Sequence, residues 1–278
     1  MNILKSFIIG IVEGLTEWMP ISSTAHIKIF NQILKMDVTP EFFEVFEVVI
    51  QLGAIVALLI VFWKSIWPFG ESKNPLGSGI LAYVKKDKFF LWLKIALACI
   101  PAIIYELFLD DYVTFINESN EMLFIAIALI VVGLVFIFVE FAIKDKTPTI
   151  PTVREITFMN AAIIGLAQLV AAIFPGVSRS GATIIVSLLM GISRTAATKF
   201  TFDLAIPVML GASFMKIIGY EGNIGFSEIF IMLAGCISAF VVSFFVINFI
   251  ISYIRKNNFI PFGVYRVLLG IVIIIFLV

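Results

Sequence analysis

The chain has 278 residues, of which 61% are hydrophobic and 14% are charged, and its formal net charge is zero. Soluble domains are about half apolar and about a quarter charged, so this composition is typical of a protein that crosses a membrane several times. A chain with zero net charge has no strong electrostatic field that would attract nucleic acid, so nucleic acid is excluded as a partner class. The two cysteines, Cys99 and Cys236, lie in apolar runs and are typical of buried hydrophobic residues rather than of a disulfide or metal pair.

The first apolar region, residues 3–36, is interrupted by the polar segment EWMPISSTAH at residues 17–26. Each half is shorter than the ~20 residues that a bilayer core requires, and Pro20 ends the first half. This pattern predicts a re-entrant helical hairpin. Three apolar runs that are long enough to cross a membrane follow, at residues 43–63, 91–109 and 120–142.

The second half of the chain repeats this order. Residues 157–191 are interrupted by FPGVSRSGAT at residues 174–183 and predict a second hairpin. Three further spans are predicted at residues 199–218, 226–251 and 260–278.

A shift of 155 residues relates the two interrupted regions and aligns Pro20 with Pro175 and Ser23 with Ser178. The sequence therefore predicts an all-α integral membrane protein with a single membrane domain of two repeats, about 1–142 and 155–278. Each repeat is a re-entrant helical hairpin plus three transmembrane helices. Since a hairpin returns to its own side and three spans change sides, the second repeat is expected to have inverted topology.

Loop charges predict the orientation. The loops at 64–88 and 143–155 are rich in lysine and arginine, whereas those at 110–121 and 219–225 carry acidic residues and no basic one. By the positive-inside rule the basic loops are cytoplasmic, which places both termini outside. The first hairpin then enters from outside and the second from the cytoplasm. Their tips are expected to meet within the membrane, in a site that opens toward the outer face.

The second interruption, FPGVSRSGAT, has the chemistry of an anion site. Non-helical backbone at membrane depth survives only inside protein or along a watery cavity, and an ionisable side chain there is a functional candidate. Arg179 supplies a permanent charge with forked donors, and Gly176, the hydroxyls of Ser178, Ser180 and Thr183 and the start of the next helix supply the rest. Helix capping would explain the hydroxyls but not the arginine. We therefore predict that these residues bind a phosphate group.

The first interruption supplies groups for acid–base and nucleophilic chemistry. Glu13 and Glu17 share one helix face, where two like charges need a cation, a metal or an arginine, or protonation of one of them. Ser23 lies three residues before His26, the only histidine in the chain. A serine beside a base is a nucleophile pattern, and a water activated by a metal on the two glutamates is the alternative. Ser22, Thr24 and Gln51 are expected to help bind the substrate, and Glu47, on the same helix face as Gln51, is a further polar side chain that could support the site.

The segments EGLTEWMPISSTAH, FEVVIQLGA and PGVSRSGAT followed by LLMGISR resemble the signature blocks of the bacterial undecaprenyl-diphosphate phosphatases, also called bacitracin-resistance proteins. The resemblance covers nearly the whole chain. It implies a plasma-membrane enzyme that converts undecaprenyl diphosphate, a polyprenyl diphosphate lipid, to the monophosphate carrier that cell-wall synthesis reuses. It also implies inverted repeats with two re-entrant hairpins and a divalent cation, Mg²⁺ or Ca²⁺, and it is consistent with a homodimer.

The resemblance also assigns roles. It implies that Glu13 and Glu17 are essential and suited to the cation, that Ser23 is the nucleophile, and that His26 or Glu17 handles the proton. Arg179 then holds the phosphate together with the residues of its own segment, Ser178, Ser180 and Thr183. One departure from the family pattern is Asp203, a carboxylate in an apolar stretch, for which Arg179 or Lys199 is the expected partner.

A secondary transporter or flippase for a phosphorylated polyprenyl lipid is the alternative function. Inverted repeats with broken helices are typical of transporters, and the glutamate pair could carry protons. The cluster of Ser22, Ser23, Thr24 and His26 argues against it, because transport does not require a nucleophile beside a base.

Overall fold

The computed structural model describes residues 1–70, 83–108 and 120–278, and within these ranges the chain is helical apart from turns and two isolated β-bridges. The parts of the predicted loops at 71–82 and 109–119, and the last residue of the predicted span 91–109, lie outside them. The helices are α1 (Asn2–Thr16), α2 (Ser23–Leu34), α3 (Pro40–Ile66), α4 (Lys86–Phe108), α5 (Glu121–Ala142), α6 (Phe158–Ile173), α7 (Arg179–Leu189), α8 (Arg194–Ile218), α9 (Phe226–Ile254) and α10 (Ile260–Phe276), with the 3₁₀ turn η4 (Val153–Glu155) before α6.

Five helices, α3, α4, α5, α8 and α9, are long and apolar enough to cross a membrane, and they coincide with five of the six predicted spans. The sixth span corresponds to α10, which has 17 residues and is slightly shorter than a bilayer core requires. The described residues therefore confirm an all-α, multi-pass membrane protein.

Both interrupted regions are pairs of short helices, as predicted. α1 and α2 are separated by residues 17–22, and α6 and α7 by residues 174–178. The second helix of each pair begins after a serine with positive φ, Ser22 (72°) and Ser178 (71°), a conformation that is strained for a residue with a Cβ. The structure thus makes Ser22 the equivalent of Ser178. The predicted alignment of Ser23 with Ser178 was wrong by one residue, because the first interruption is one residue longer.

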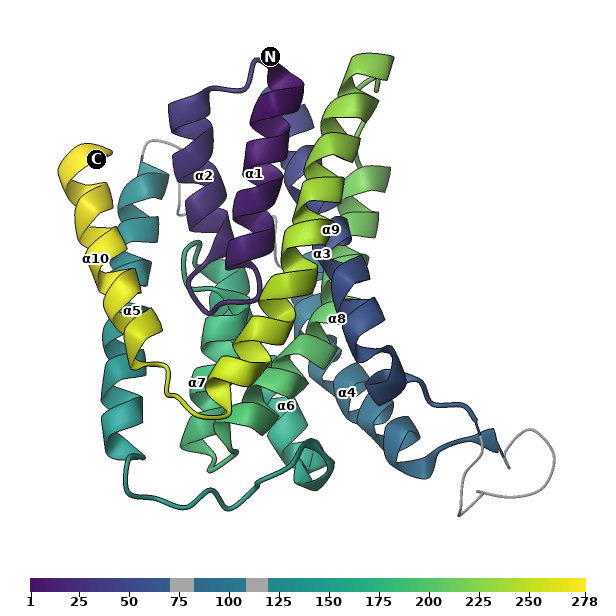
Figure 1. Cartoon of the computed structure of the whole chain (residues 1–278), viewed down its shortest axis with the longest axis vertical. Coiled ribbons are helices and arrows are strands. Elements are labelled where there is room, and N and C mark those ends of the chain that lie inside the picture. The colour runs from purple at the N-terminus through teal and green to yellow at the C-terminus, as the bar shows by residue number, and fades with distance from the viewer. Residues whose placement is uncertain (71–82, 109–119) are drawn as a thin grey trace.

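The two short-helix pairs lie at opposite ends of the molecule (Figure 1). The α1–α2 pair lies in the upper half and the α6–α7 pair in the lower half, and both chain termini lie at the upper end. The packing of the two halves corresponds: α1 and α3 pack against α9, and α6 and α8 pack against α4. α3 also packs against α8, and α5 against α10.

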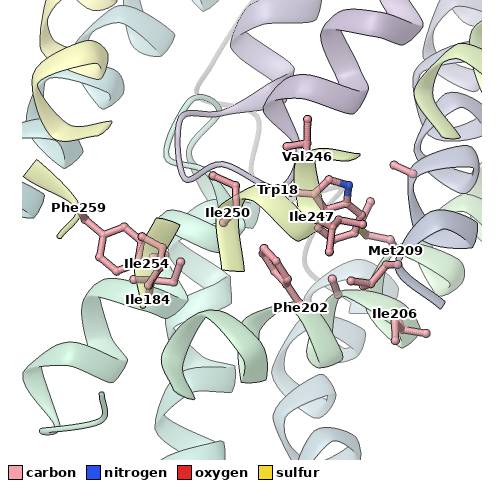
Figure 2. Close-up of a cluster of buried hydrophobic side chains, with 14 of the residues drawn as sticks. Trp18, Ile184, Phe202, Ile206, Met209, Val246, Ile247, Ile250, Ile254 and Phe259 are labelled. Carbon is pink, nitrogen blue, oxygen red and sulfur yellow. The ribbon is translucent and has the colours of Figure 1, made fainter. Parts of the chain in front are cut away.

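A buried apolar cluster anchors the first interruption to the long helices (Figure 2). Trp18 is 1% exposed and meets Phe202 of α8 edge-on, with ring centroids 5.2 Å apart. Ile247 and Ile250 of α9 belong to the same cluster. An edge-to-face aromatic pair adds about 0.5–1.5 kcal/mol to the stabilisation that comes from burial alone. This packing fixes the chain at Trp18 and so fixes the side chain before it, Glu17.

Candidate active site

The carboxylate of Glu17 connects the two interrupted regions. Arg179, the first residue of α7, donates a hydrogen bond from Nη2 to Oε1 of Glu17 at 2.9 Å. Ser23, the first residue of α2, donates from Oγ to Oε2 of the same carboxylate at 2.6 Å. Side chains that are 162 and 6 positions away in sequence thus meet at one group. An arginine was one of the predicted partners of the glutamate pair, and for Glu17 it comes from the other half of the chain.

These groups line a cavity of about 360 Å³ between the two interruptions. Nine of the predicted site residues line it: Glu17, Ser22, Ser23, Thr24, Gln51, Gly176, Ser178, Arg179 and Ser180. The remaining wall includes apolar side chains of α6 and α8, namely Ala171, Ala172, Val208, Met209 and Ala212. The cavity is therefore polar where the two interruptions meet and apolar on its other side.

The start of α7 forms the wall of this cavity that was predicted to bind an anion. Ser178 caps the helix by accepting a hydrogen bond from the Gly181 N–H at 3.2 Å, and its Oγ lies 3.0 Å from Oγ of Ser180. The helix dipole places partial positive charge at this end. Gly176 adopts φ +90°, and a Cβ there would lie 2.9 Å from the backbone of Ile125 in α5, so glycine is required by the close approach.

Thr183 has a different position from the one its predicted role implies. Its hydroxyl donates to the carbonyl of Arg179 at 2.9 Å and lies 2.9 Å from the hydroxyl of Thr201 in α8. Thr183 is fully buried and does not line the cavity. It therefore holds the first turn of α7 against α8 rather than facing a ligand directly.

Glu13 lies in α1 one helical turn before Glu17, is completely buried and does not line the cavity. Neither of its carboxylate oxygens has a hydrogen-bond partner in the described part of the chain, and Oε1 of Glu47 is buried in the same way. Glu17, Glu47 and Arg179 are its electrostatic neighbours. Carboxylate oxygens are the ligand atoms that Mg²⁺ and Ca²⁺ prefer, so the two oxygens of Glu13, which lack a hydrogen-bond partner, fit a hard cation.

Comparisons with known proteins identify the family. The family model described as bacitracin resistance protein BacA matches residues 6–272. A protein named undecaprenyl-diphosphatase from Desulfitobacterium hafniense is 42% identical over 276 residues, covering 99% of this chain and 96% of its own. A protein of the same name from Enterococcus faecalis is 44% identical over 275 residues, covering 99% of this chain and 97% of its own.

The chain belongs to the BacA family.

In this BacA chain the predicted pair of Ser23 and His26 is not formed. The imidazole donates from Nδ1 to the carbonyl of Ser22 at 2.7 Å, so Nε2 accepts the hydrogen bond from the hydroxyl of Tyr265, also at 2.7 Å. Both ring nitrogens are occupied, and His26 does not line the cavity. Glu17, rather than His26, accepts the hydrogen bond of the Ser23 hydroxyl.

Two residues of the site, Tyr265 and Arg266, were missed from the sequence. Arg266 of α10 is fully buried and donates from Nη1 to the carbonyl of Pro20 at 3.1 Å. Its Nη2 donates to the carbonyls of Gly176 and Val177 at 2.8 and 3.0 Å. One guanidinium therefore ties the two interruptions together. A tyrosine and an arginine in the middle of an apolar span were the signal that could have found them.

Asp203 of α8 forms neither of the ion pairs that were expected for it. Its side chain is completely buried, and neither carboxylate oxygen has a hydrogen-bond partner in the described ranges. Arg179 is engaged with Glu17, and the ammonium of Lys199 lies over the ring of Phe62, 5.9 Å from its centroid. Lys199 and Lys88 are the opposite charges that interact with it electrostatically.

Proposed function

We propose that this chain hydrolyses undecaprenyl diphosphate to undecaprenyl phosphate and phosphate in the cavity between the two interruptions. One observation carries the proposal: the carboxylate of Glu17 holds a serine hydroxyl at 2.6 Å and an arginine at 2.9 Å beside a helix start. In this proposal the serine hydroxyl is the nucleophile, the carboxylate is its base, and the arginine with the helix start binds the anion. Phosphoryl transfer requires these three functions. The relatives' name, undecaprenyl-diphosphatase, supplies the substrate.

In this proposal Arg179 and the start of α7 bind the terminal phosphate of the lipid. Oγ of Ser23 attacks its phosphorus while Oε2 of Glu17 takes the hydroxyl proton. The Oγ–P bond forms as the bridging P–O bond breaks, and undecaprenyl phosphate leaves as an anion that needs no proton. Water then attacks the phosphorus of the phosphoserine, and Glu17 returns its proton to Oγ of Ser23 as the Oγ–P bond breaks. Phosphate leaves with the protons of the water, and both the serine and the glutamate are restored. Arg179 stabilises the negative charge in both steps.

Glu13 and Glu17 would hold a divalent cation, Mg²⁺ or Ca²⁺. Among the described residues no group of three or more histidine, cysteine, aspartate and glutamate side chains is placed to bind a metal, so phosphate oxygens would supply the remaining ligands. When bound, the cation supplies charge stabilisation at the phosphoryl oxygens. It would also give the orphaned oxygens of Glu13 a partner.

The apolar wall of the cavity suits the lipid. Ala171 and Ala172 of α6 and Val208, Met209 and Ala212 of α8 face the same space as Arg179. A prenyl chain would lie against this wall, with its diphosphate turned toward the two interruptions. A free diphosphate in water would gain nothing from these residues, which is why a lipid is the better substrate class.

The proposed membrane arrangement is the inverted repeat. The two short-helix pairs lie at opposite ends of the molecule and both termini lie at one end, which suits two re-entrant hairpins that enter from opposite sides (Figure 1). The matching contacts of α1 with α9 and of α6 with α4 support the twofold relation. With the basic loop at 143–155 in the cytoplasm, both termini and the mouth of the cavity face outside the plasma membrane.

Phosphate release by the purified protein tests the function. We expect wild-type protein in detergent to release phosphate from undecaprenyl diphosphate, to stop when EDTA is added and to resume with Mg²⁺ or Ca²⁺. Lipid movement without phosphate release would favour the flippase instead. Activity that is unchanged by EDTA would remove the cation from the proposal and leave the serine mechanism intact.

A further inference from the structure

A second cavity lies at the end of the molecule opposite to both termini, where α4 and α8 begin (Figure 1). It measures about 430 Å³ and lies between the first turns of these helices and the segment around η4. It shares no lining residue with the cavity of the active site. Along α8, Lys199 of this cavity and Val208 of the other are separated by about 14 Å of helix.

The second cavity is strongly basic. Lys88, Lys94, Arg154 and Lys199 line it, against the single carboxylate of Asp87. Arg154 pairs with Asp87 at 2.9 Å, and Lys94 donates to the backbone carbonyl of Arg154 at 3.1 Å. In the described part of the chain, the ammonium groups of Lys88 and Lys199 neither donate a hydrogen bond nor form an ion pair. The ammonium of Lys199 also lies over the ring of Phe62, 5.9 Å from its centroid. Both cations thus line the cavity without a hydrogen-bond acceptor or an ionic partner among the described residues.

The buried carboxylate of Asp203 does not balance these charges. It interacts electrostatically with Lys88 and Lys199 but bonds neither of them. Even with Asp203 included, the four basic side chains of the cavity face two acidic ones. Lys88 and Lys199 also repel each other. An anion bound between the two ammonium groups would relieve that repulsion.

Two helix starts strengthen the attraction for an anion. Lys88 lies in the first turn of α4, and Thr195 and Ala196 lie in the first turn of α8. Both helices therefore direct the positive ends of their dipoles toward this cavity. Phosphate groups are the usual ligands of such helix starts when lysines stand beside them.

An apolar surface adjoins the cavity. Phe89 and Phe90 of α4 and Phe158 of α6 are 44%, 38% and 43% exposed. The rings of Phe90 and Phe158 meet edge-on at 6.5 Å, and the ammonium of Lys94 lies 6.0 Å from the centroid of the Phe158 ring. The charged cavity thus passes directly into a face that suits hydrocarbon chains. Basic pockets between membrane helices typically bind anionic lipid head groups in this way.

We propose that this cavity binds the phosphate group of an anionic membrane lipid, with Lys88 and Lys199 as the phosphate ligands. The acyl chains would lie along Phe89, Phe90 and Phe158. Free inorganic phosphate presents the same group without chains. The site is separate from the proposed catalytic cavity and does not depend on the activity proposed there.

Native mass spectrometry of the delipidated protein tests this site. Protein in detergent is titrated with phosphatidylglycerol and, separately, with phosphatidylcholine, whose phosphate is neutralised by its own choline. We expect phosphatidylglycerol to be retained more strongly. Each lysine near a lipid phosphate is worth about fivefold in affinity, so Lys88→Gln with Lys199→Gln should weaken retention about 25-fold. The pair Lys88→Arg with Lys199→Arg should keep it.

The matched control is Lys144→Gln with Lys146→Gln, which removes the same charge from exposed positions in the segment between α5 and η4. We expect this control to retain phosphatidylglycerol like the wild type. Displacement of the lipid by inorganic phosphate, but not by chloride at equal ionic strength, would identify phosphate itself as a sufficient ligand; no displacement would show that the chains are needed. Equal retention of both lipids by the wild type would overturn the proposal. Undiminished retention by the double glutamine variant would also overturn it.

Discussion

Replacing Arg266 with lysine should uncouple the two halves of the active site. The arginine makes three hydrogen bonds to carbonyls, one at Pro20 and two at Gly176 and Val177. Lysine has a single terminal nitrogen and can reach one interruption but not both at once. One bond is lost if the lysine turns to Gly176 and Val177, and two are lost if it turns to Pro20; a hydrogen bond from a charged donor is worth about 1.5–3 kcal/mol. The contacts that hold the interruptions together should weaken by about 1.5–6 kcal/mol.

The effect on catalysis follows from the geometry. Ser23 belongs to one interruption and Arg179 to the other, and a shift of about 1 Å between reacting groups costs about 10²-fold in rate. We expect kcat of the Arg266→Lys variant to fall about 100-fold. KM should change less, because the residues proposed to bind phosphate all lie on the α6–α7 side of the cavity.

Initial rates of phosphate release at several lipid concentrations separate the two constants, and circular dichroism shows whether the helices remain folded. Arg255→Lys, an exposed arginine changed in the same way, is the control and should keep wild-type rates. A folded Arg266→Lys protein with wild-type kcat would refute the proposal that this guanidinium positions the two interruptions.

Three further changes have defined outcomes. Arg179→Lys keeps the charge but loses the planar fork, so phosphate release should fall more than about tenfold; near wild-type turnover would remove this arginine from the site. In a chain without its two native cysteines, Asn223→Cys should react with an impermeant thiol reagent in intact cells and Asp145→Cys should not, and the reverse pattern would overturn the orientation. Glu140→Ala removes the buried acceptor of Arg194 and of a backbone N–H in the α9–α10 turn. It should lower the free energy of unfolding by about 2 kcal/mol, a figure reduced because Arg194 is partly exposed; an unchanged thermal midpoint would contradict this.

The sequence was sufficient for the features that depend on local chemistry. Pro20 and Pro175 ended the first helix of each interrupted pair in the prediction, and in the structure α1 ends at Thr16 and α6 at Ile173, upstream of the two prolines. The segment around Arg179 was predicted to be an anion site from residue types alone; the structure places Ser178, Arg179 and Ser180 in the lining of one cavity, and anion binding there stays a prediction. The prediction that Glu13 and Glu17 needed a positive partner named an arginine as one choice, and Arg179 takes that place for Glu17.

The features of the site that the sequence did not predict depend on contacts between segments that are far apart in the chain. Sequence proximity predicted that His26 would serve Ser23, but Tyr265, 239 positions away from the histidine, takes its free nitrogen. Arg266 was missed for the same reason, since nothing near it in sequence shows that α10 reaches both interruptions. Asp203 was expected to find a cation, and its oxygens remain without a hydrogen bond in the described chain. Each of these outcomes depends on which helices pack together, which a local pattern does not determine.

The most direct test of the proposed mechanism is to measure turnover and lipid binding for Ser23→Ala in one preparation, with Ser22→Ala as the control. If Ser23 attacks phosphorus, the Ser23→Ala protein should bind undecaprenyl diphosphate almost as well as wild type, because the anion site at the start of α7 is unchanged. Its rate of phosphate release should fall at least about 10³-fold, as expected for loss of a nucleophile, and Ser22→Ala should be impaired less. Substantial turnover by the Ser23→Ala protein would contradict the serine mechanism and assign the attack to water activated at Glu13 and Glu17.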